Sequence, residues 1–302
     1  MTDPLPTPSD FDGPPDARTL HLPDDRRLGF AEYGRPAGWP VFGFFGASAR
    51  RFRPNDAETT AAGVRLIVLE RPGFGLSDPL PPRSLLAWTS DVAALADALG
   101  LARFAVIGSS QGGPYGAACA YALRPRVTAL ALVSALSSFE IPGVTQGMAA
   151  PLRLLPVLAR RVPWLVTWMN QAAAGMARRD PERFFKQTFG ALPAADQQAV
   201  QKNPEIKTSM LADVPEIYRQ GSQGVNQAVQ VACGPWGFRA EDIRVPTVVW
   251  QGEADPNVPP AMGRYLARAI PNAQAHFVPG AGHFLGFTHW AEILASLLRL
   301  AA

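Results

Sequence analysis

The chain contains little cysteine and little lysine, and its basic and acidic residues are nearly balanced. Of its 302 residues only 2 are cysteines, Cys119 and Cys233, which are too few for a disulfide framework and are not spaced as metal ligands. Lysine occurs only at Lys186, Lys202 and Lys207, and arginine supplies the remaining positive charge. The 28 basic and 25 acidic side chains give a net charge of +3, a balance that argues against a nucleic-acid partner.

The chain also lacks a long uninterrupted apolar run. A membrane-spanning helix needs about 18 or more consecutive apolar residues, and the most apolar long stretch, residues 149–169, is broken by arginines and prolines. The N-terminus has no basic start followed by an apolar segment, so no signal peptide is visible. We therefore expect a cytoplasmic protein without stable membrane insertion. Its hydrophobic fraction of 47% and charged fraction of 18% are typical of a globular protein with a large core.

Apolar runs of strand length alternate with helical patterns in the first half of the chain and again near its end. Leu85, Trp88, Val92 and Leu95 recur at helical spacing, for example, and Gly100 ends that predicted helix. Such strands separated by helices are typical of a mostly parallel sheet with helices on both faces, and we predict this α/β fold. The first two strands are close enough to form an antiparallel hairpin on its edge. The predicted strands are residues 19–22, 28–33, 41–45, 65–69, 104–107, 129–133, 247–251 and 275–278, and the later helices are residues 260–269 and 287–300.

This alternation is interrupted by residues 138–233, where helical patterns are broken by repeated prolines. We expect this stretch, called the cap segment below, to be a helical insertion into one α/β core domain formed by residues 17–137 and 234–302. Residues 1–16 are rich in Pro and Asp, and we expect a loose N-terminal tail. The Leu, Val, Trp and Met side chains between 154 and 169 suggest an apolar pocket, although we expect most of them to pack the cap helices together.

The strongest chemical pattern is the pentapeptide GSSQG at residues 108–112. An apolar strand precedes it and a helix of small residues follows it, so the chain reads strand, tight turn, helix with the pattern G-x-S-x-G at the turn. A turn of this kind holds its central serine in a strained, exposed backbone conformation. The flanking glycines fit because a side chain there would clash with the neighbouring strand and helix. The pattern predicts Ser110, and not Ser109, as a nucleophile.

A serine hydroxyl becomes a good nucleophile only with a base within hydrogen-bond reach and a third group that orients the base. His283 lies in a glycine-rich loop after the last predicted strand, at the edge of the sheet where Ser110 also lies. We predict His283 as the base and Asp255, in the loop after the preceding strand, as the orienting acid. Glu253 is a rival acid, but its position favours a solvated side chain. Nothing in the sequence places the other histidines near the serine, and we interpret them as structural: His21, His276 and His289.

Acyl transfer also needs hydrogen-bond donors for the developing oxyanion. One donor would be the backbone N–H of Gln111, at the start of the helix that follows the serine. The loop after the strand at residues 41–45 should supply the second donor, and the backbone N–H of Ala47 in that small-residue turn is our candidate.

The order Ser110, Asp255, His283 on an interrupted α/β chain resembles the α/β-hydrolase superfamily, over nearly the whole chain except the tail and the cap segment. The resemblance is also carried by the segment RPGFGLSD at residues 71–78, by the Gly-x-x-Asp-x-x-Val-Pro segment around Asp255 and by the Gly-His pair that ends at His283. It implies a cap that roofs the site. Glu70 and Asp78, which flank the 71–78 segment, are interpreted as turn and ion-pair residues at the rim of the domain.

The chain departs from this superfamily in its oxyanion loop, which usually reads His-Gly-x-Pro-Gly. Phe45, Ser48 and Ala49 stand where the histidine, the proline and the second glycine are expected. This departure is the reason to keep a non-catalytic binding protein as an alternative function.

These features predict a cofactor-free and metal-free serine hydrolase that cleaves carboxylic ester-like bonds through an acyl-enzyme, with carboxylesterase activity as the best interpretation. The substrate would be a small molecule with an apolar acyl or aromatic part. Hydrolysis of lactones, carbon–carbon bonds or peptides stays open, as does the oligomeric state. Dehalogenase and epoxide hydrolase chemistry is disfavoured because the resembling families use a carboxylate in place of Ser110. The alternatives are a non-catalytic small-molecule-binding protein on the same scaffold and an acyltransferase; a role at a membrane surface ranks last.

Overall fold

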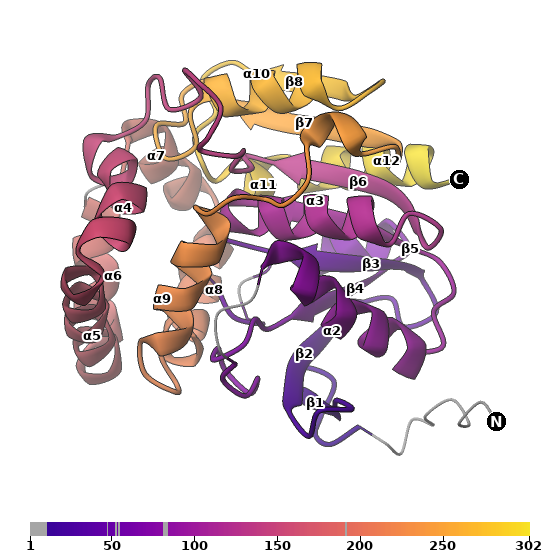
Figure 1. Cartoon of the computed structure of the whole chain (residues 1–302), viewed down its shortest axis with the longest axis horizontal. Coiled ribbons are helices and arrows are strands. Elements are labelled where there is room, and N and C mark those ends of the chain that lie inside the picture. Colours follow the sequence, from indigo (N-terminus) through magenta and orange to yellow (C-terminus); the bar gives the residue numbers. More distant parts are fainter. Residues whose placement is uncertain (1–10, 47, 52, 54, 81–83, 191) are drawn as a thin grey trace.

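A computed structural model describes residues 11–302, except residues 47, 52, 54, 81–83 and 191. Within the described residues eight strands form one sheet in the order β1-β2-β4-β3-β5-β6-β7-β8 (Figure 1). The strands β3 to β8 run parallel, whereas β1 and β2 pair antiparallel with each other and β2 pairs antiparallel with β4. This confirms the predicted mostly parallel sheet with an edge hairpin. The strands are β1 Arg18–His21, β2 Arg27–Gly34, β3 Trp39–Phe44, β4 Val64–Leu69, β5 Phe104–Ser109, β6 Val127–Val133, β7 Thr247–Gly252 and β8 Gln274–Val278.

Alternating side chains of the central strands supply two separate cores, one on each face of the sheet. In β5, Phe104 and Val106 belong to one core, whereas Ala105 and Ile107 belong to the other, because successive residues of a strand point to opposite faces. Both faces are apolar, so the strand is a continuous apolar run without polar alternation. This is the feature that made the sheet predictable from the sequence.

Helices cover both faces of the sheet. The first core packs against α2 (Leu85–Ala98), α3 (Gly113–Ala122) and α10 (Pro260–Ala269), and the second packs against α12 (Trp290–Ala301), beside which lies α1 (Asp56–Ala61).

The predicted helix at residues 287–300 is divided into α11 (Leu285–Thr288) and α12, with His289 as the N-cap residue of α12. Trp290 begins α12 fully buried, and its Nε1–H donates to Thr59 Oγ1 of α1 at 2.8 Å.

The cap segment lies between β6 and β7 in the sequence and contains no strand among its described residues. Its helices gather beyond one end of the sheet, at the left in Figure 1. They are α4 Ala150–Arg161, α5 Pro163–Arg179, α6 Pro181–Gly190, α7 Ala194–Lys202, α8 Pro204–Ile217 and α9 Gln223–Ala232.

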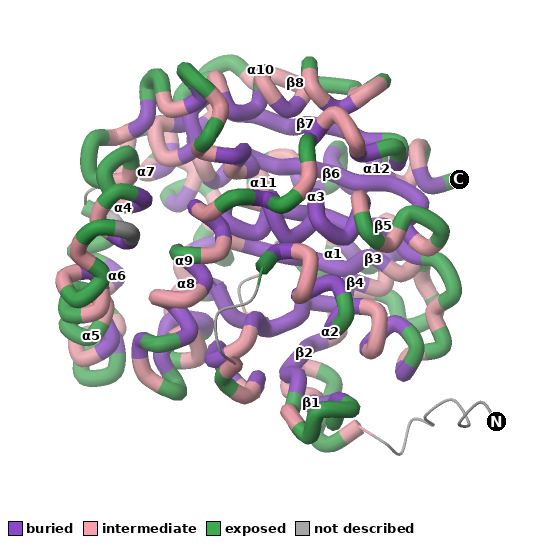
Figure 2. Tube along the Cα trace, in the orientation of Figure 1, coloured by how far each residue is buried: buried purple, intermediate pink, exposed green. Residues whose placement is uncertain are grey.

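The apolar side chains of α4 and α5 are more exposed than we expected from the sequence. Trp164 is 70% exposed and Trp168 is 63% exposed, and Leu154, Val157 and Met169 are also exposed. The outer cap helices carry exposed and half-buried residues along most of their length, in contrast to the buried strands (Figure 2). The expectation that most of these side chains pack the cap helices together is therefore wrong, because the two helices turn much of their apolar surface outward.

The expected loose tail at residues 1–16 also needs correction at its C-terminal end. Residues 1–10 lie outside the described residues, but Phe11 packs its ring edge-on against Phe30 of β2, with ring centroids 5.5 Å apart. Asp12 exchanges two backbone hydrogen bonds with Thr19 of β1. An aromatic contact and a strand bridge thus attach residues 11 and 12 to the edge hairpin.

Candidate active site

Ser110 occupies a sharp turn between a strand and a helix. The strand β5 ends at Ser109, a short 3₁₀ turn spans Ser110–Gly112, and α3 begins at Gly113. The φ angle of Ser110 is +54°, a conformation that costs a non-glycine residue on the order of 1–3 kcal/mol. Two backbone hydrogen bonds stabilise it: the N–H of Ser110 donates to Ser134 O at 3.0 Å, and the N–H of Leu136 donates to Ser110 O at 2.9 Å.

The glycines on either side of Ser110 are required by close backbone contacts. A Cβ atom on Gly112 would lie 2.0 Å from the carbonyl oxygen of Phe44 at the end of β3. A Cβ atom on Gly108 would lie 2.9 Å from the carbonyl oxygen of Gly112. The turn is therefore packed backbone to backbone against β3 and against the start of α3.

The structure brings His283 and Asp255 next to Ser110. Nε2 of His283 lies 3.0 Å from Ser110 Oγ, and Nδ1 of His283 lies 2.8 Å from Asp255 Oδ2. Asp255 is only 2% exposed, and its Oδ1 accepts the backbone N–H groups of Asn257 and Val258, both at 2.9 Å. Because the carboxylate can only accept, Nδ1 carries the hydrogen and Nε2 is left to accept the serine hydroxyl hydrogen.

The environment of His283 favours its protonated form. Burial alone would lower the pKa of the imidazole, but the charge and the hydrogen bond of Asp255 outweigh it, helped by the charge of Asp196, and the pKa is raised. An imidazole stabilised as imidazolium is suited to hold a proton taken from a serine.

The other acids and histidines that we considered do not join this group. Glu253 is exposed and pairs with Arg264 at 3.0 Å. His276 stacks on Trp250 with ring centroids 4.2 Å apart, and its pKa is lowered by burial and by Arg299. His21 is exposed near Asp12, and His289 shares a 2.8 Å hydrogen bond with Thr288.

The loop after β3 approaches the serine, although Ala47 itself lies outside the described residues. A Cβ atom on Gly46 would lie 3.7 Å from Ser110 Oγ, so the backbone of this loop borders the hydroxyl. Gln111 follows Ser110 in the 3₁₀ turn and is buried. Phe45 stands at the position where the superfamily has histidine. It is buried in the core that packs against α12, and its ring centroid lies 6.2 Å from that of Trp290.

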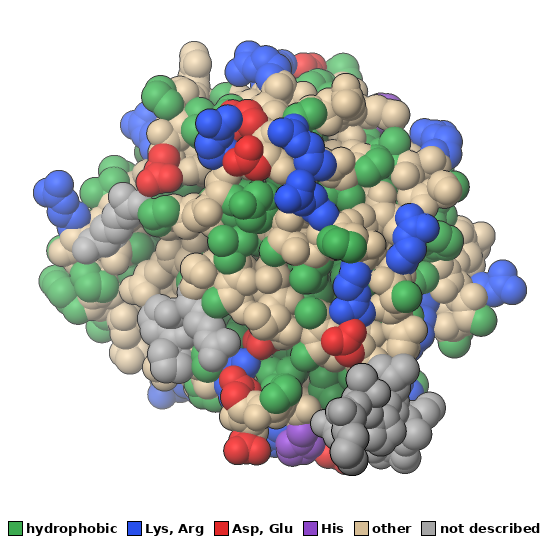
Figure 3. Space-filling view, turned by 45° about the vertical axis from the view of Figure 1, so that its right-hand side comes forward, with side chains coloured by type: hydrophobic (Ala, Val, Ile, Leu, Met, Phe, Trp, Pro, Cys, Tyr) green, Lys and Arg blue, Asp and Glu red, His purple; other side chains and the backbone are tan. Residues whose placement is uncertain are grey.

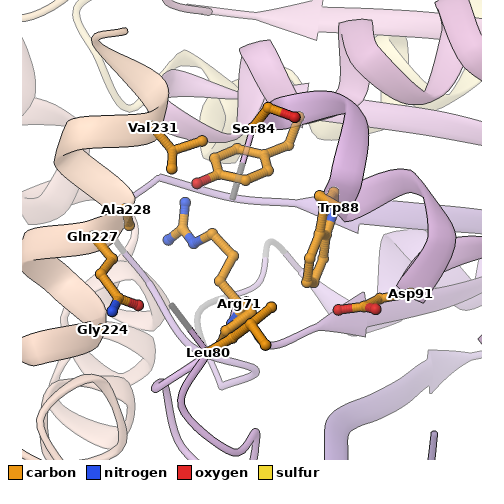
Figure 4. Close-up of a pocket in the computed structure, with 11 residues that line it drawn as sticks. Arg71, Leu80, Ser84, Trp88, Asp91, Gly224, Gln227, Ala228 and Val231 are labelled. Carbon is orange, nitrogen blue, oxygen red and sulfur yellow. The ribbon is translucent and has the colours of Figure 1, made fainter. Parts of the chain in front are cut away.

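The guanidinium of Arg71 binds the backbone of the same loop. Its Nη2 donates to the carbonyl oxygens of Gly46 and of Ser48, the latter at 3.1 Å. The side chain extends between α9, which carries Ala228, and α2, which carries Trp88 (Figure 4). The cavity here measures about 40 Å³, which is room for a few water molecules. The sequence singled out the segment that contains Arg71 but assigned no role to this side chain.

The structure corrects the interpretation of Glu70, the residue that precedes the 71–78 segment. The sequence placed it at the rim of the domain, but the side chain is fully buried and its Oε1 accepts Arg50 Nη1 at 2.8 Å. Its Oε2 accepts the backbone N–H of Leu76 at 2.6 Å. Asp78 does form a partly exposed surface pair, with Arg27. The two residues differ because Glu70 directly follows β4 inside the sheet, where its carboxylate is buried, whereas Asp78 lies further along the loop at the surface.

Two acids of the cap segment contact the loops around Ser110, and sequence reasoning missed both. Oδ1 of Asp196 on α7 accepts the backbone N–H of Phe284 at 2.9 Å, next to His283. Asp213 on α8 accepts the N–H of Ala49 through Oδ2 and that of Arg51 through Oδ1, both at 2.8 Å. No pattern in the sequence indicates these contacts, because each joins positions many tens of residues apart.

Other kinds of site are not indicated by the residues described here. Among them, no group of three or more His, Cys, Asp or Glu side chains could hold a metal ion. Over the same part of the chain, no helix is both long and apolar enough to cross a membrane. The face drawn in Figure 3 carries its Lys and Arg side chains singly or in small groups among acidic and apolar ones, without a continuous basic surface.

Curated relatives of the chain are hydrolases. It is 24% identical over 245 residues to a 2-hydroxy-6-oxononadienedioate/2-hydroxy-6-oxononatrienedioate hydrolase of Cupriavidus pinatubonensis, a match that covers 79% of this chain and 76% of the relative. It is 27% identical over 246 residues to the protein of the same name from Paraburkholderia xenovorans, with the same two coverages.

Solved structures share the fold. The enol-lactonase from Burkholderia xenovorans superimposes with a TM-score of 0.67 and 20% identity, over 93% of this chain and 98% of that one. A thermophilic esterase from Thermogutta terrifontis superimposes with a TM-score of 0.64 and 22% identity, over 94% and 97%. The family model described as alpha/beta hydrolase fold matches residues 42–289. The chain therefore belongs to the alpha/beta hydrolase fold family.

Proposed function

We propose that the protein is a serine hydrolase that cleaves carboxylic ester-like bonds through an acyl-enzyme intermediate. The observation that carries this proposal is the continuous set of hydrogen bonds from Asp255 through His283 to Ser110 Oγ, at 2.8 and 3.0 Å. This arrangement joins a nucleophile, a base and an orienting acid.

The reaction would proceed in two halves. Ser110 Oγ attacks the substrate carbonyl carbon while its proton passes to His283 Nε2, and the tetrahedral intermediate collapses when that proton reaches the leaving alkoxide. His283 then takes a proton from water, whose oxygen attacks the acyl-enzyme, and returns it to Ser110 as the acid leaves. Throughout, Asp255 holds the imidazole in one tautomer and balances its positive charge.

The oxyanion would be bound by backbone N–H groups on two segments. Gln111, in the 3₁₀ turn that precedes α3, is one proposed donor, and Ala47, in the loop after β3, is the other. The approach of Gly46 to Ser110 and the hydrogen bonds from Arg71 to this loop support that assignment, since a fixed loop is needed for preorganised donors. One such donor contributes about 2.7–4 kcal/mol to transition-state stabilisation.

The substrate class is narrowed by the relatives only in part. Their names point to dienedioate-type acids, and the solved neighbours include an enol-lactonase and an esterase. We therefore propose a small carbonyl substrate with an apolar part and place esters first, with lactones and 2-hydroxy-6-oxo-dienedioates as the other two members of a test panel.

The test uses p-nitrophenyl esters of increasing acyl length. Ser110→Ala should lower kcat/KM by roughly 10⁴-fold or more, because the nucleophile is removed. Ser109→Ala is the matched control, since it removes a neighbouring hydroxyl outside the hydrogen-bonded set, and it should retain activity within a few-fold. Equal turnover by wild type and Ser110→Ala would refute the assignment.

The alternative is a small-molecule-binding protein without catalysis, and the replaced residues Phe45, Ser48 and Ala49 of the oxyanion loop favour it. A fluorophosphonate probe separates the two functions. Covalent labelling of Ser110 at neutral pH supports the hydrolase, whereas ligand binding without labelling supports the binding protein. An acyltransferase would also be labelled, but it would show faster ester consumption when an alcohol or thiol acceptor is added.

A further inference from the structure

Asp196 is a fully buried carboxylate of the cap segment that touches the loop carrying His283. It lies in the first turn of α7, is 0% exposed, and accepts the backbone N–H of Phe284, 88 positions away in the chain, through Oδ1 at 2.9 Å. Its Oδ2 is buried and has no hydrogen-bond partner within the described residues. A buried carboxylate with one oxygen unsatisfied is costly, and so its presence at this point calls for a reason other than packing.

The carboxylate of Asp196 also packs closely against Gly282, the residue before His283. A Cβ atom built on Gly282 would lie 2.3 Å from Asp196 Oδ1 and 2.7 Å from its Cγ. Only a glycine fits here, and its φ angle is not in the left-handed region. The requirement for Gly282 thus comes from the closeness of Asp196 and not from the backbone conformation of the loop.

Two negative groups act on the imidazole of His283, and they come from different parts of the chain. Asp255, in the loop after β7, contributes charge and a hydrogen bond, and Asp196, on the cap segment, contributes charge alone. The pKa of Asp196 itself is raised, mainly because the carboxylate is buried. The backbone N–H groups of Phe284 and His283 and the charge of His283 counter this effect, whereas the charge of Asp255 adds to it.

We propose that Asp196 is a positioning residue through which helix α7 of the cap segment holds the loop of the base His283 in place. The inference rests on the proposed function for its catalytic meaning. The hydrogen bond to Phe284 and the contact with Gly282 fix the backbone on both sides of His283, and the buried charge stabilises the imidazolium formed when Ser110 gives up its proton.

The first test measures the pKa of the His283 imidazole by NMR and needs no substrate. The chain has only 4 histidines, so the His283 signals can be assigned with a His283→Gln variant. In Asp196→Asn, which keeps an oxygen acceptor for Phe284 but removes the charge, the pKa of His283 should fall, because one of the two negative charges that favour the imidazolium is lost. Asp180→Asn is the matched control: Asp180 is an exposed cap aspartate that also accepts a backbone N–H, from Arg183 at 2.9 Å, and its loss should not move the pKa.

The second test separates position from charge by kinetics. Asp196→Ala removes the anchor and should lower kcat by about 10-fold or more with little change in KM, because small displacements of a catalytic group cost rate. Asp196→Asn should keep kcat within a few-fold while the acid limb of kcat/KM moves to lower pH, in parallel with the NMR result. A general loss of stability alone would not shift that limb.

The third test uses the contact with Gly282. Gly282→Ala should destabilise the wild type, and the same change should cost much less in an Asp196→Gly background, where the carboxylate is absent. Additive effects of the two changes would contradict the contact.

The proposal is overturned if the pKa of His283 is the same in wild type and Asp196→Asn, or if a folded Asp196→Ala variant keeps its kcat within twofold. Should Asp196→Ala fail to fold, the pKa of His283 in Asp196→Asn still supports or overturns the proposal. A failure of the proposed function would appear as undiminished turnover by Ser110→Ala, and the NMR titration would be unaffected by it, so the two failures are distinguishable.

Discussion

Substitution of Glu70 by alanine should lower the unfolding free energy of this protein more than substitution of a surface acid. The Glu70 carboxylate is fully buried at the end of β4 and accepts Arg50 Nη1 at 2.8 Å and the N–H of Leu76 at 2.6 Å. Arg50 is itself only 2% exposed, and its remaining carboxylate partner is Glu216 of α8, also at 2.8 Å. In Glu70→Ala, the buried guanidinium of Arg50 would therefore lose one of its carboxylate partners, and the partly buried N–H of Leu76 would lose its acceptor.

The size of the effect follows from this burial. Truncating one partner of a buried ion pair leaves an uncompensated charge and costs about 3–5 kcal/mol of unfolding free energy. Glu216 retains part of the neutralisation of Arg50, so we expect the lower half of that range. The exposed pair of Glu253 and Arg264 provides the comparison, because a solvated pair contributes only about 0.2–1 kcal/mol.

Urea denaturation, followed by tryptophan fluorescence and circular dichroism, measures the unfolding free energy of the Glu70 and Glu253 variants. Glu70→Ala should lower the midpoint clearly, and Glu253→Ala should leave it close to the wild-type value. Glu70→Gln, which retains an oxygen for Leu76, should fall between Glu70→Ala and wild type. A loss of less than about 1 kcal/mol for Glu70→Ala would refute the reasoning, since solvent or another group would then have to neutralise Arg50.

Three further predictions concern the site and the core. Because His283 must be neutral to act as a base and its pKa is raised, kcat/KM should fall on acidification with a midpoint above 6.5; a midpoint below pH 6 would contradict this. Gly112→Ala should lower the unfolding free energy by about 1–3 kcal/mol because its Cβ would meet the Phe44 carbonyl. Gly175→Ala, in open space on α5, should be neutral or stabilising, and thermal denaturation of the two variants measures the difference. Cys119 is fully buried and burial raises the pKa of its thiol, so a disulfide reagent should modify it only after unfolding; rapid modification of the native protein would show that α3 opens.

Most of the fold could be predicted because its information is local. Runs such as residues 104–107 are apolar at every position, and helical spacing recurs from Leu85 to Leu95, so strands and helices follow from short stretches of sequence. The elbow at Ser110 was predictable for the same reason, since glycine on both sides of a serine is an unusual local requirement. Asp255 and His283 became candidates because each follows a strand end; their catalytic roles, like that of Ser110, stay predictions until the variants are measured.

The layered sheet, its edge hairpin and the family follow from the amino-acid order alone, because periodicity and turn chemistry are properties of neighbouring residues. Four other features emerge only when the chain is folded: Glu70 is buried, Arg71 binds the loop beside Ser110, α4 and α5 expose their tryptophans, and Asp196 reaches the loop of His283. These outcomes depend on contacts between segments far apart in the chain, and nothing in a residue's own neighbourhood encodes which distant surface will cover it.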